Sequence, residues 1–239
     1  MAMSEFDRIS ELLLSSLQPM ALAMIKVTLP LTAISFSLGL LIAVLTAIVR
    51  IANIKILKQF SEFYIWIFRG TPLLVQLFII YYGLPALGVK FYDNKAVSAV
   101  LGIGLSEFIP GVIALGLNSG AYVCEIFRSG IQSIDKGQTE AARSLGLSHR
   151  QTLQYIIFPQ AFRTALPTLG NEFVAIIKES SIVSVIGIAD LMYKANIVRG
   201  NTFLPFEPLL VAALCYFLLT YPLSRLLARI EKGMNHAES

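Results

Sequence analysis

The sequence predicts an all-α integral membrane protein with five transmembrane helices. Of its 239 residues 56% are hydrophobic and 14% are charged, whereas a soluble domain carries about 25% charged residues. The mean hydropathy is +0.70. A soluble domain of this size cannot bury so much apolar surface, because a small fold keeps a large share of its residues at the surface. A bilayer removes this difficulty.

The five predicted spans follow from apolar segments of about the 20 residues that a helix needs to cross a bilayer. Four are apolar throughout: residues 20–49, 60–86, 109–127 and 203–227. The fifth, residues 161–191, is interrupted by Glu172, Lys178 and Glu179. Because a spanning backbone must satisfy its own hydrogen bonds, we expect this segment to be helical and to face protein rather than lipid.

The distribution of positive charge predicts the orientation. Five spans place the two ends on opposite sides, and with the N-terminus outside, eleven of the nineteen Lys and Arg residues lie inside against five outside. The positive-inside rule therefore favours an outer N-terminus and a cytoplasmic C-terminus. We expect an amphipathic segment at 1–19, one membrane domain at 20–230 with a polar cytoplasmic loop at 135–159, and a cytoplasmic tail at 231–239.

Composition also argues against several function classes. The net charge of +4 is spread among the spans, so membrane orientation explains it better than nucleic-acid binding does. Cys124 and Cys215 lie in apolar segments, as small buried hydrophobes do, and His149 and His236 are too far apart to predict a metal site. The sequence has neither a phosphate-binding loop nor a nucleophile with a partner base. We expect no enzyme activity and no cofactor in this chain.

The polar loop reads as two short helices joined by a turn. Asp135 is placed to cap the first helix, and Gly146 to end it in the left-handed conformation. Ser148 and Gln151 have the spacing of a capping box for the second helix. Pro159 is expected to end that helix and to start the next span.

The first helix of the loop is expected to expose Ala141, Ala142 and Leu145 beside the charged Glu140 and Arg143. Small side chains let another protein approach the backbone closely, which suits a helix that docks in a groove. The alternative is an ordinary helical hairpin that serves stability alone.

The loop resembles the EAA signature of ABC importer permeases. That signature is carried at Glu140, Ala141, Ala142, Gly146, Ile156 and Pro159. All spacings are kept, and one position departs, because Phe158 stands where the family has leucine. The stretch from Phe68 to Gln76 and the run Asn171-Glu172-Phe173 resemble permeases for polar amino acids, so that the resemblance covers about residues 20–230.

The resemblance implies the core of a type I ABC importer in the bacterial inner membrane. Such permeases work as pairs, as a homodimer or with a related second subunit, on two ATPase subunits that bind ATP and Mg²⁺. An extracytoplasmic binding protein delivers the substrate, here a polar amino acid such as cystine, arginine or glutamine. The signature residues would then form the helix that couples this chain to the ATPase.

Polar residues at membrane depth usually line a cavity or a bundle interior. Asn118, Tyr122 and Glu125 recur at helical spacing and are expected on one face of the third span. Arg128, three residues after Glu125, is placed to form an ion pair with it. This stripe is our first candidate for a substrate path.

In that hypothesis Glu125 and Glu172 meet the ammonium of an amino acid, while Arg69 and Asn118 meet its carboxylate. Gln76 lines the path or bonds to a neighbouring helix. The alternative is that these groups only join helices or subunits. Pro72, in the second span, is expected to free a backbone carbonyl and kink the helix, as a packing feature or a gating hinge.

Two other functions remain as alternatives at this point. A self-sufficient secondary transporter or channel would be expected to show inverted repeats and matching discontinuous helices, and the sequence shows neither. A structural scaffold gives no reason for the loop signature.

Overall fold

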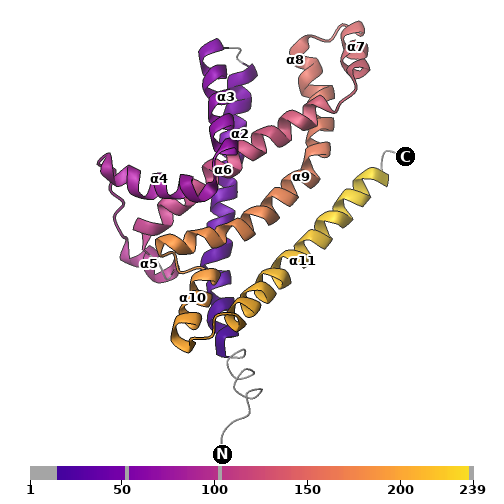
Figure 1. Cartoon of the computed structure of the whole chain (residues 1–239). Coiled ribbons are helices and arrows are strands. Elements are labelled where there is room, and N and C mark those ends of the chain that lie inside the picture. The colour runs from indigo at the N-terminus through magenta and orange to yellow at the C-terminus, as the bar shows by residue number, and fades with distance from the viewer. Residues whose placement is uncertain (1–14, 52–53, 102–103, 237–239) are drawn as a thin grey trace, which may run out of the picture.

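A computed structural model describes residues 15–51, 54–101 and 104–236, which form helices and no strand. Figure 1 shows these helices. They are η1 (Met24–Thr28), α2 (Leu29–Ile51), α3 (Lys55–Gly70), α4 (Leu73–Ala86), α5 (Lys95–Leu101), α6 (Leu105–Gln132), α7 (Lys136–Ser144), α8 (His149–Thr152), η2 (Leu153–Ile157), α9 (Phe158–Glu179), η3 (Ser180–Ile186), α10 (Leu191–Thr202) and α11 (Glu207–His236). The predicted all-α class is confirmed for the described residues.

The first span is part of one long helix that runs from Ser15 to Val49. Residues 15–19 continue directly into it, and the rest of the predicted N-terminal segment, residues 1–14, lies outside the described part of the chain. A π-helical turn, η1, closes where the N–H of Leu29 bonds to the carbonyl of Met24. Pro30 follows at once, and the wider turn accommodates a residue that has no N–H to donate.

The second predicted span is broken into two helices. The chain bends by 112° between α3 and α4, with Thr71 and Pro72 in extended conformation at the bend. The residue before a proline disfavours the helical region, and proline cannot donate the next helical hydrogen bond. The segment predicted as a single kinked span, residues 60–86, is therefore a helix, a sharp turn and a second helix.

Three helices in the described chain are long and apolar enough to cross a membrane: the first helix, α6 and α11. The pair α3 and α4 adds a fourth span if it crosses as one broken unit. α9 carries the charges that interrupt the fifth predicted span, and it buries Ala161, Ala165 and Leu169 within the protein. Lys178 and Glu179 are exposed, and α9 is not among the candidate spans of the described chain, so that the fifth span stays a prediction.

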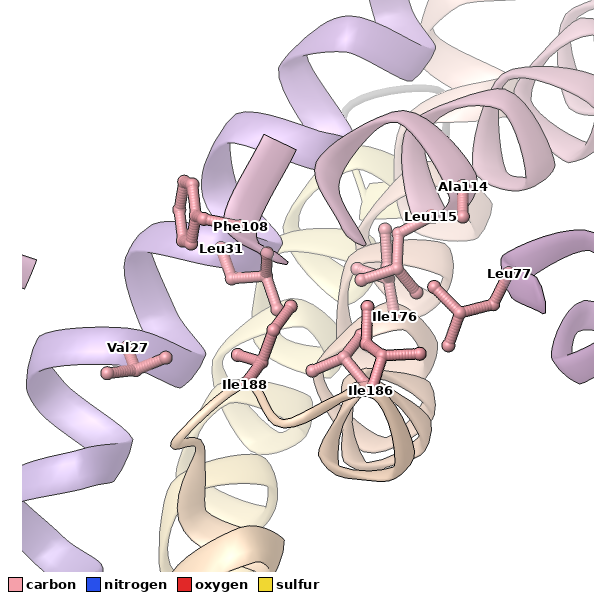
Figure 2. Close-up of a cluster of buried hydrophobic side chains, with 10 residues drawn as sticks. Val27, Leu31, Leu77, Phe108, Ala114, Leu115, Ile176, Ile186 and Ile188 are labelled. Atoms are coloured by element: carbon pink, nitrogen blue, oxygen red, sulfur yellow. The ribbon is translucent and has the colours of Figure 1, made fainter. Parts of the chain in front are cut away.

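The largest buried cluster forms where η1, α2, α4, α6, α9, η3 and the segment after η3 meet (Figure 2). Its members are Val27, Leu31, Leu77, Phe108, Ala114, Leu115, Ile176, Val183, Ile186 and Ile188. All ten side chains are apolar. Because lipid tails are apolar as well, burial away from water does not favour this cluster over contact with lipid, and close packing between the helices stabilises it instead.

α6 lies at the centre because small residues let its neighbours approach. A side chain added at Gly130 would place its Cβ 2.9 Å from the carbonyl oxygen of Ala161 on α9. One added at Gly39 on α2 would come within 3.0 Å of the backbone nitrogen of Gly120. Glycine at such crossings is typical of membrane helices that pack backbone to backbone.

The fold has two distinct ends. Figure 1 shows the α7–α8 loop and the C-terminal half of α11 toward one end, with the junction of α2 and α3. α10 and the start of α11 lie at the opposite end. The polar loop and the α10–α11 turn are therefore on opposite sides of the bundle.

Candidate functional site: a capped loop and a polar face of α6

The polar loop begins at Asp135, three residues after the end of α6. Asp135 caps α7, because its carboxylate Oδ1 accepts a hydrogen bond of 2.7 Å from the backbone N–H of Gly137. A carboxylate here also favours the positive end of the helix. The predicted cap is confirmed, and it fixes the start of α7 close to α6.

Gly146 ends α7 with a Schellman motif. Its φ of 84° lies in the left-handed region, where residues with a Cβ are strained. The N–H of Leu147 donates to the carbonyl of Ala142 at 3.1 Å, and the N–H of Gly146 to that of Arg143 at 3.0 Å. These two bonds define the motif, so the prediction that Gly146 ends the helix is confirmed.

The second helix of the loop starts as predicted but does not end at Pro159. Ser148 and Gln151 form the capping box. α8 then continues through the π turn η2 into α9, and the N–H of Phe158 donates to the carbonyl of Leu153. The π turn closes at the residue before Pro159, just as η1 closes before Pro30. The expected break is wrong, because the wider turn absorbs the proline without ending the helix.

The signature residues differ in exposure. Glu140 and Ala141 are exposed, and Leu145 is 82% exposed, a high value for a leucine. Ala142 is buried, so the expectation that it shares the exposed face is wrong. Glu140, Ala141 and Leu145 are exposed on that face. Ile156 is half-buried and Pro159 exposed. The loop thus presents a small charged and apolar face at one end of the molecule.

A second group of polar side chains forms hydrogen bonds to the backbone at the break between α3 and α4. Pro72 leaves the carbonyl of Phe68 without its helical donor, and the side-chain amides of Gln76 and Asn118 donate to it at 2.9 and 3.2 Å. Gln76 also donates to the carbonyl of Thr71 at 3.0 Å and accepts from Asn118 at 2.9 Å. In this conformation both amides hold the break together.

We expect Gln76→Leu to destabilise the protein by roughly 1–3 kcal/mol, because it removes a donor to the carbonyls of Phe68 and Thr71 and leaves the buried Asn118 amide without the Gln76 acceptor. The measurement is the thermal unfolding midpoint of the purified protein in detergent. Gln59→Leu, the same substitution at an exposed position of α3, is the matched control. Equal midpoints for the two variants would show that the break does not depend on this amide.

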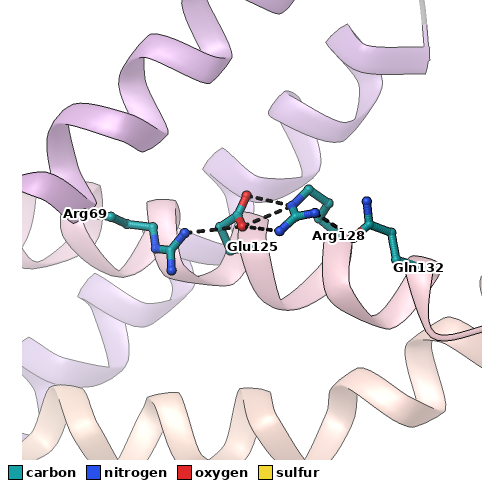
Figure 3. Close-up of polar contacts among 4 residues, drawn as sticks. All are labelled: Arg69, Glu125, Arg128 and Gln132. Carbon is teal, nitrogen blue, oxygen red and sulfur yellow. Dashed lines mark hydrogen bonds and ion pairs between the residues drawn. The ribbon is translucent and has the colours of Figure 1, made fainter.

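An ion-pair cluster lies further along the same face of α6 (Figure 3). The Glu125 carboxylate accepts from the Nε and Nη2 of Arg128 at 2.8–3.0 Å, as predicted from their spacing. Arg69, at the end of α3, approaches the same carboxylate at 3.3 Å. Arg69 also lies over the ring of Tyr122, 5.4 Å from its centre, a cation–π contact.

The cluster has two guanidinium groups for one carboxylate, so it carries an excess positive charge. The side chains of Arg69 and Arg128 are 42% and 41% exposed, so that both remain accessible. Gln132 accepts from Arg128 at 2.6 Å and is the last residue of α6 before the loop. The cluster therefore connects the α3–α4 break to the end of α6 that leads into α7.

Glu172 belongs to a different contact. Its carboxylate on α9 accepts a hydrogen bond of 2.9 Å from the hydroxyl of Ser119 on α6, and it makes no ion pair within the described chain. Ser119 was absent from the sequence-based candidates. The signal for it was weak, because Ser119 lies off the face of Asn118 and Tyr122 and only the packing of α9 reveals it.

The structure thus brings Arg69, Tyr122 and Glu125 together, pairs Gln76 with Asn118, and separates Glu172 from both groups. Among the residues that the structure describes, no three His, Cys, Asp or Glu side chains gather in a way that would hold a metal ion.

Comparison with known proteins decides the family. The family described as "Binding-protein-dependent transport system inner membrane component" matches residues 35–236, most of the chain. The chain belongs to this family. As an inner membrane component of binding-protein-dependent transport, it is a permease and not an enzyme.

Relatives of this permease have names from amino-acid transport. It is 44% identical over 208 residues to a protein of Rickettsia typhi provisionally named as the glutamine transport system permease GlnP, covering 87% of this chain and 89% of the relative. It is 37% identical over 216 residues to the arginine transport system permease protein ArtQ of Bacillus subtilis, covering 90% and 93%.

A solved structure agrees with the fold. It is the crystal structure of an amino acid ABC transporter with histidines. The matched chain is 40% identical to this permease with a TM-score of 0.78, and the match covers 97% of this permease and 99% of that chain. The inward-facing MetNI methionine ABC transporter is 18% identical with a TM-score of 0.60, which supports the fold alone.

Proposed function

We propose that this permease carries a polar amino acid, such as cystine, arginine or glutamine, from an extracytoplasmic binding protein into the cytoplasm. Two ATP-binding subunits supply the energy, with ATP and Mg²⁺ bound in those partners, and a second permease copy or homologue completes the channel. The observation that carries this proposal is the α7–α8 loop, with Glu140, Ala141 and Leu145 exposed together at one end of the bundle.

The coupling role follows from how the loop is built. Asp135 and Gly146 fix both ends of α7, so that this short helix moves as a unit with α6 and α9. An exposed leucine beside small and charged residues suits a partner groove. We assign the contact with the ATPase to Glu140, Ala141 and Leu145, and the positioning of that contact to Ala142, Gly146, Ile156 and Pro159.

For the orientation we propose five spans, with the N-terminus outside and the C-terminus in the cytoplasm. α9 completes the set of five, since its Glu172 contacts Ser119 on α6 rather than lipid. The excess of Lys and Arg on the side of the α7–α8 loop supports this arrangement. The loop then faces the cytoplasm, where ATP is available.

The substrate path is proposed along the polar face of α6. Arg69, with the excess positive charge of its cluster, meets the carboxylate, and Tyr122 and Glu125 hold Arg69 in place. Glu172, which has only a hydroxyl as its described partner, is the better group for the ammonium. Gln76 and Asn118 shape the path, because their amides hold the α3–α4 break.

The test is uptake into liposomes that contain this permease with its ATPase, supplied with the binding protein and labelled arginine, glutamine or cystine. We expect uptake that requires both ATP and the binding protein. Uptake that persists without ATP would instead identify a self-sufficient secondary transporter. A matched preparation with ATP but without the binding protein tests whether uptake requires substrate delivery by that protein in addition to ATP hydrolysis.

A further inference from the structure

The last turn of α10, beside the turn that leads to α11, carries a guanidinium group without an ionic partner in the described chain. Arg199 lines an open cavity of about 460 Å³ with Asn196, Gly200, Phe203 and Pro205. Its Nη1 donates to the Asn196 side chain at 3.0 Å, and its Nε is buried without a hydrogen-bond partner. Within the described chain no acidic group pairs with it. Because a guanidinium stays charged, this cavity suits an anion.

The same turn directs aromatic side chains outward. Phe203 ends α10 with a φ of 56°, and the left-handed region costs a residue with a Cβ about 1–2 kcal/mol. Its side chain is 90% exposed, and that of Phe206 is 63% exposed. Two bare phenyl rings in water are unfavourable, so their surroundings are expected to be partly apolar.

An exposed apolar stripe continues from this turn along α11. The stripe consists of Phe206, Leu210, Leu214, Phe217 and Tyr221, each at least 47% exposed. Their spacing of three or four residues places them on one helix face. Only 17% of the apolar core of α11 is buried in the protein. The turn is therefore continuous with a surface that faces lipid.

The depth of the turn in the membrane follows from the charges on α11. No charged residue occurs in the 17 residues from 208 to 224, which span ~26 Å of helix. This length approaches the ~30 Å of the hydrocarbon core. Glu207 and the turn therefore lie at headgroup level on one side, and Arg225 on the other. Aromatic residues are common at that depth.

We propose that the α10–α11 turn binds the phosphate of a glycerophospholipid headgroup, with Arg199 as the cationic group and Phe203 as the aromatic anchor. Guanidinium groups match phosphate oxygens in geometry and charge. The site lies in the leaflet opposite the α7–α8 loop. It tethers α10, whose buried residues pack against the start of the first helix and against α11.

The first test places a fluorescent probe at the turn. Trp66 is the single tryptophan of the chain, so the fluorescence that Trp66→Phe combined with Phe203→Trp adds over Trp66→Phe alone comes from position 203, whatever tryptophans the partner proteins carry. In nanodiscs that hold the permease with its ATPase, we expect lipids brominated near the headgroup end of their acyl chains to quench this probe. His149→Trp in the same background, at an exposed position of the α7–α8 loop, is the control and should not be quenched.

The second test addresses the phosphate. Association of spin-labelled phosphatidylglycerol with the complex should fall about fivefold in Arg199→Gln, since one basic residue near an anionic lipid surface contributes about 1 kcal/mol. Lys194→Gln, on the same helix but outside the cavity, should leave it unchanged.

An unquenched probe at position 203 overturns the proposal, and so does equal lipid association in both glutamine variants. If Arg199→Gln instead weakens capture of the binding protein and leaves lipid association intact, the turn is a protein-docking face. These outcomes do not depend on transport, so a failure of uptake would count against the proposed function and not against this site.

Discussion

Gly146→Val lowers ATP-driven uptake roughly tenfold, because a residue with a Cβ in the left-handed conformation costs about 1–2 kcal/mol and 1.4 kcal/mol corresponds to a factor of ten. The Schellman motif at the end of α7 then forms less often, and the angle between α7 and α8 is lost. The measurement is the initial rate of uptake in the reconstituted system, together with ATPase activity in the presence of binding protein.

Gly88→Val is the matched control. Gly88 has a φ of 86°, nearly that of Gly146, and a Cβ at either position has open space around it. Both substitutions therefore impose a similar backbone strain, but Gly88 follows α4, far along the chain from the coupling loop. We expect Gly88→Val to keep uptake. A similar loss of uptake in both variants would assign the effect of Gly146 to general stability and remove the coupling role.

Glu125→Gln changes the selectivity between cationic and neutral substrates. The substitution removes the carboxylate that compensates Arg69 and Arg128, so the local charge rises by one unit. At a separation of about 10 Å and an effective dielectric constant of about 20, one unit charge contributes about 1.7 kcal/mol. We therefore expect the KM for arginine to rise roughly 15- to 20-fold relative to the KM for glutamine.

Two further variants separate charge from packing. Adding Arg69→Gln to Glu125→Gln restores the original net charge and should restore the KM ratio. Glu62→Gln, at an exposed position of α3, removes a carboxylate away from the polar face and should leave the ratio unchanged. If the ratio stays constant in Glu125→Gln as well, the cluster only joins α3 to α6.

The parts of the site that were predicted correctly depend on residues close in sequence. The caps at Asp135 and Ser148, the left-handed Gly146 and the pair of Glu125 with Arg128 each join groups at most six residues apart. Such contacts follow from helix geometry and side-chain chemistry alone. The burial of Ala142 was missed, because which face of α7 turns inward depends on how the loop packs against η2.

The proline positions show a similar limit. Sequence chemistry correctly identified Pro72 and Pro159 as residues that disturb a helix. At Pro72 the chain turns by 112°, and at Pro159 a π turn keeps the helix continuous. The difference is tertiary, since Gln76 and Asn118 satisfy the carbonyl that is freed at the first site. Nothing in the local sequence distinguishes these two outcomes.

By itself, the sequence determined that this chain is helical, that it is a membrane protein and that it has a loop with the spacing of the EAA signature. Hydrophobicity over 20 residues and fixed motif spacing are local properties that need no knowledge of packing. Only the tertiary structure decided which polar groups meet. Arg69 reaches Glu125, and Ser119 reaches Glu172, across more than 50 positions of the chain. Such pairs depend on the rotation and crossing of packed helices, which glycines such as Gly130 permit and no single segment encodes.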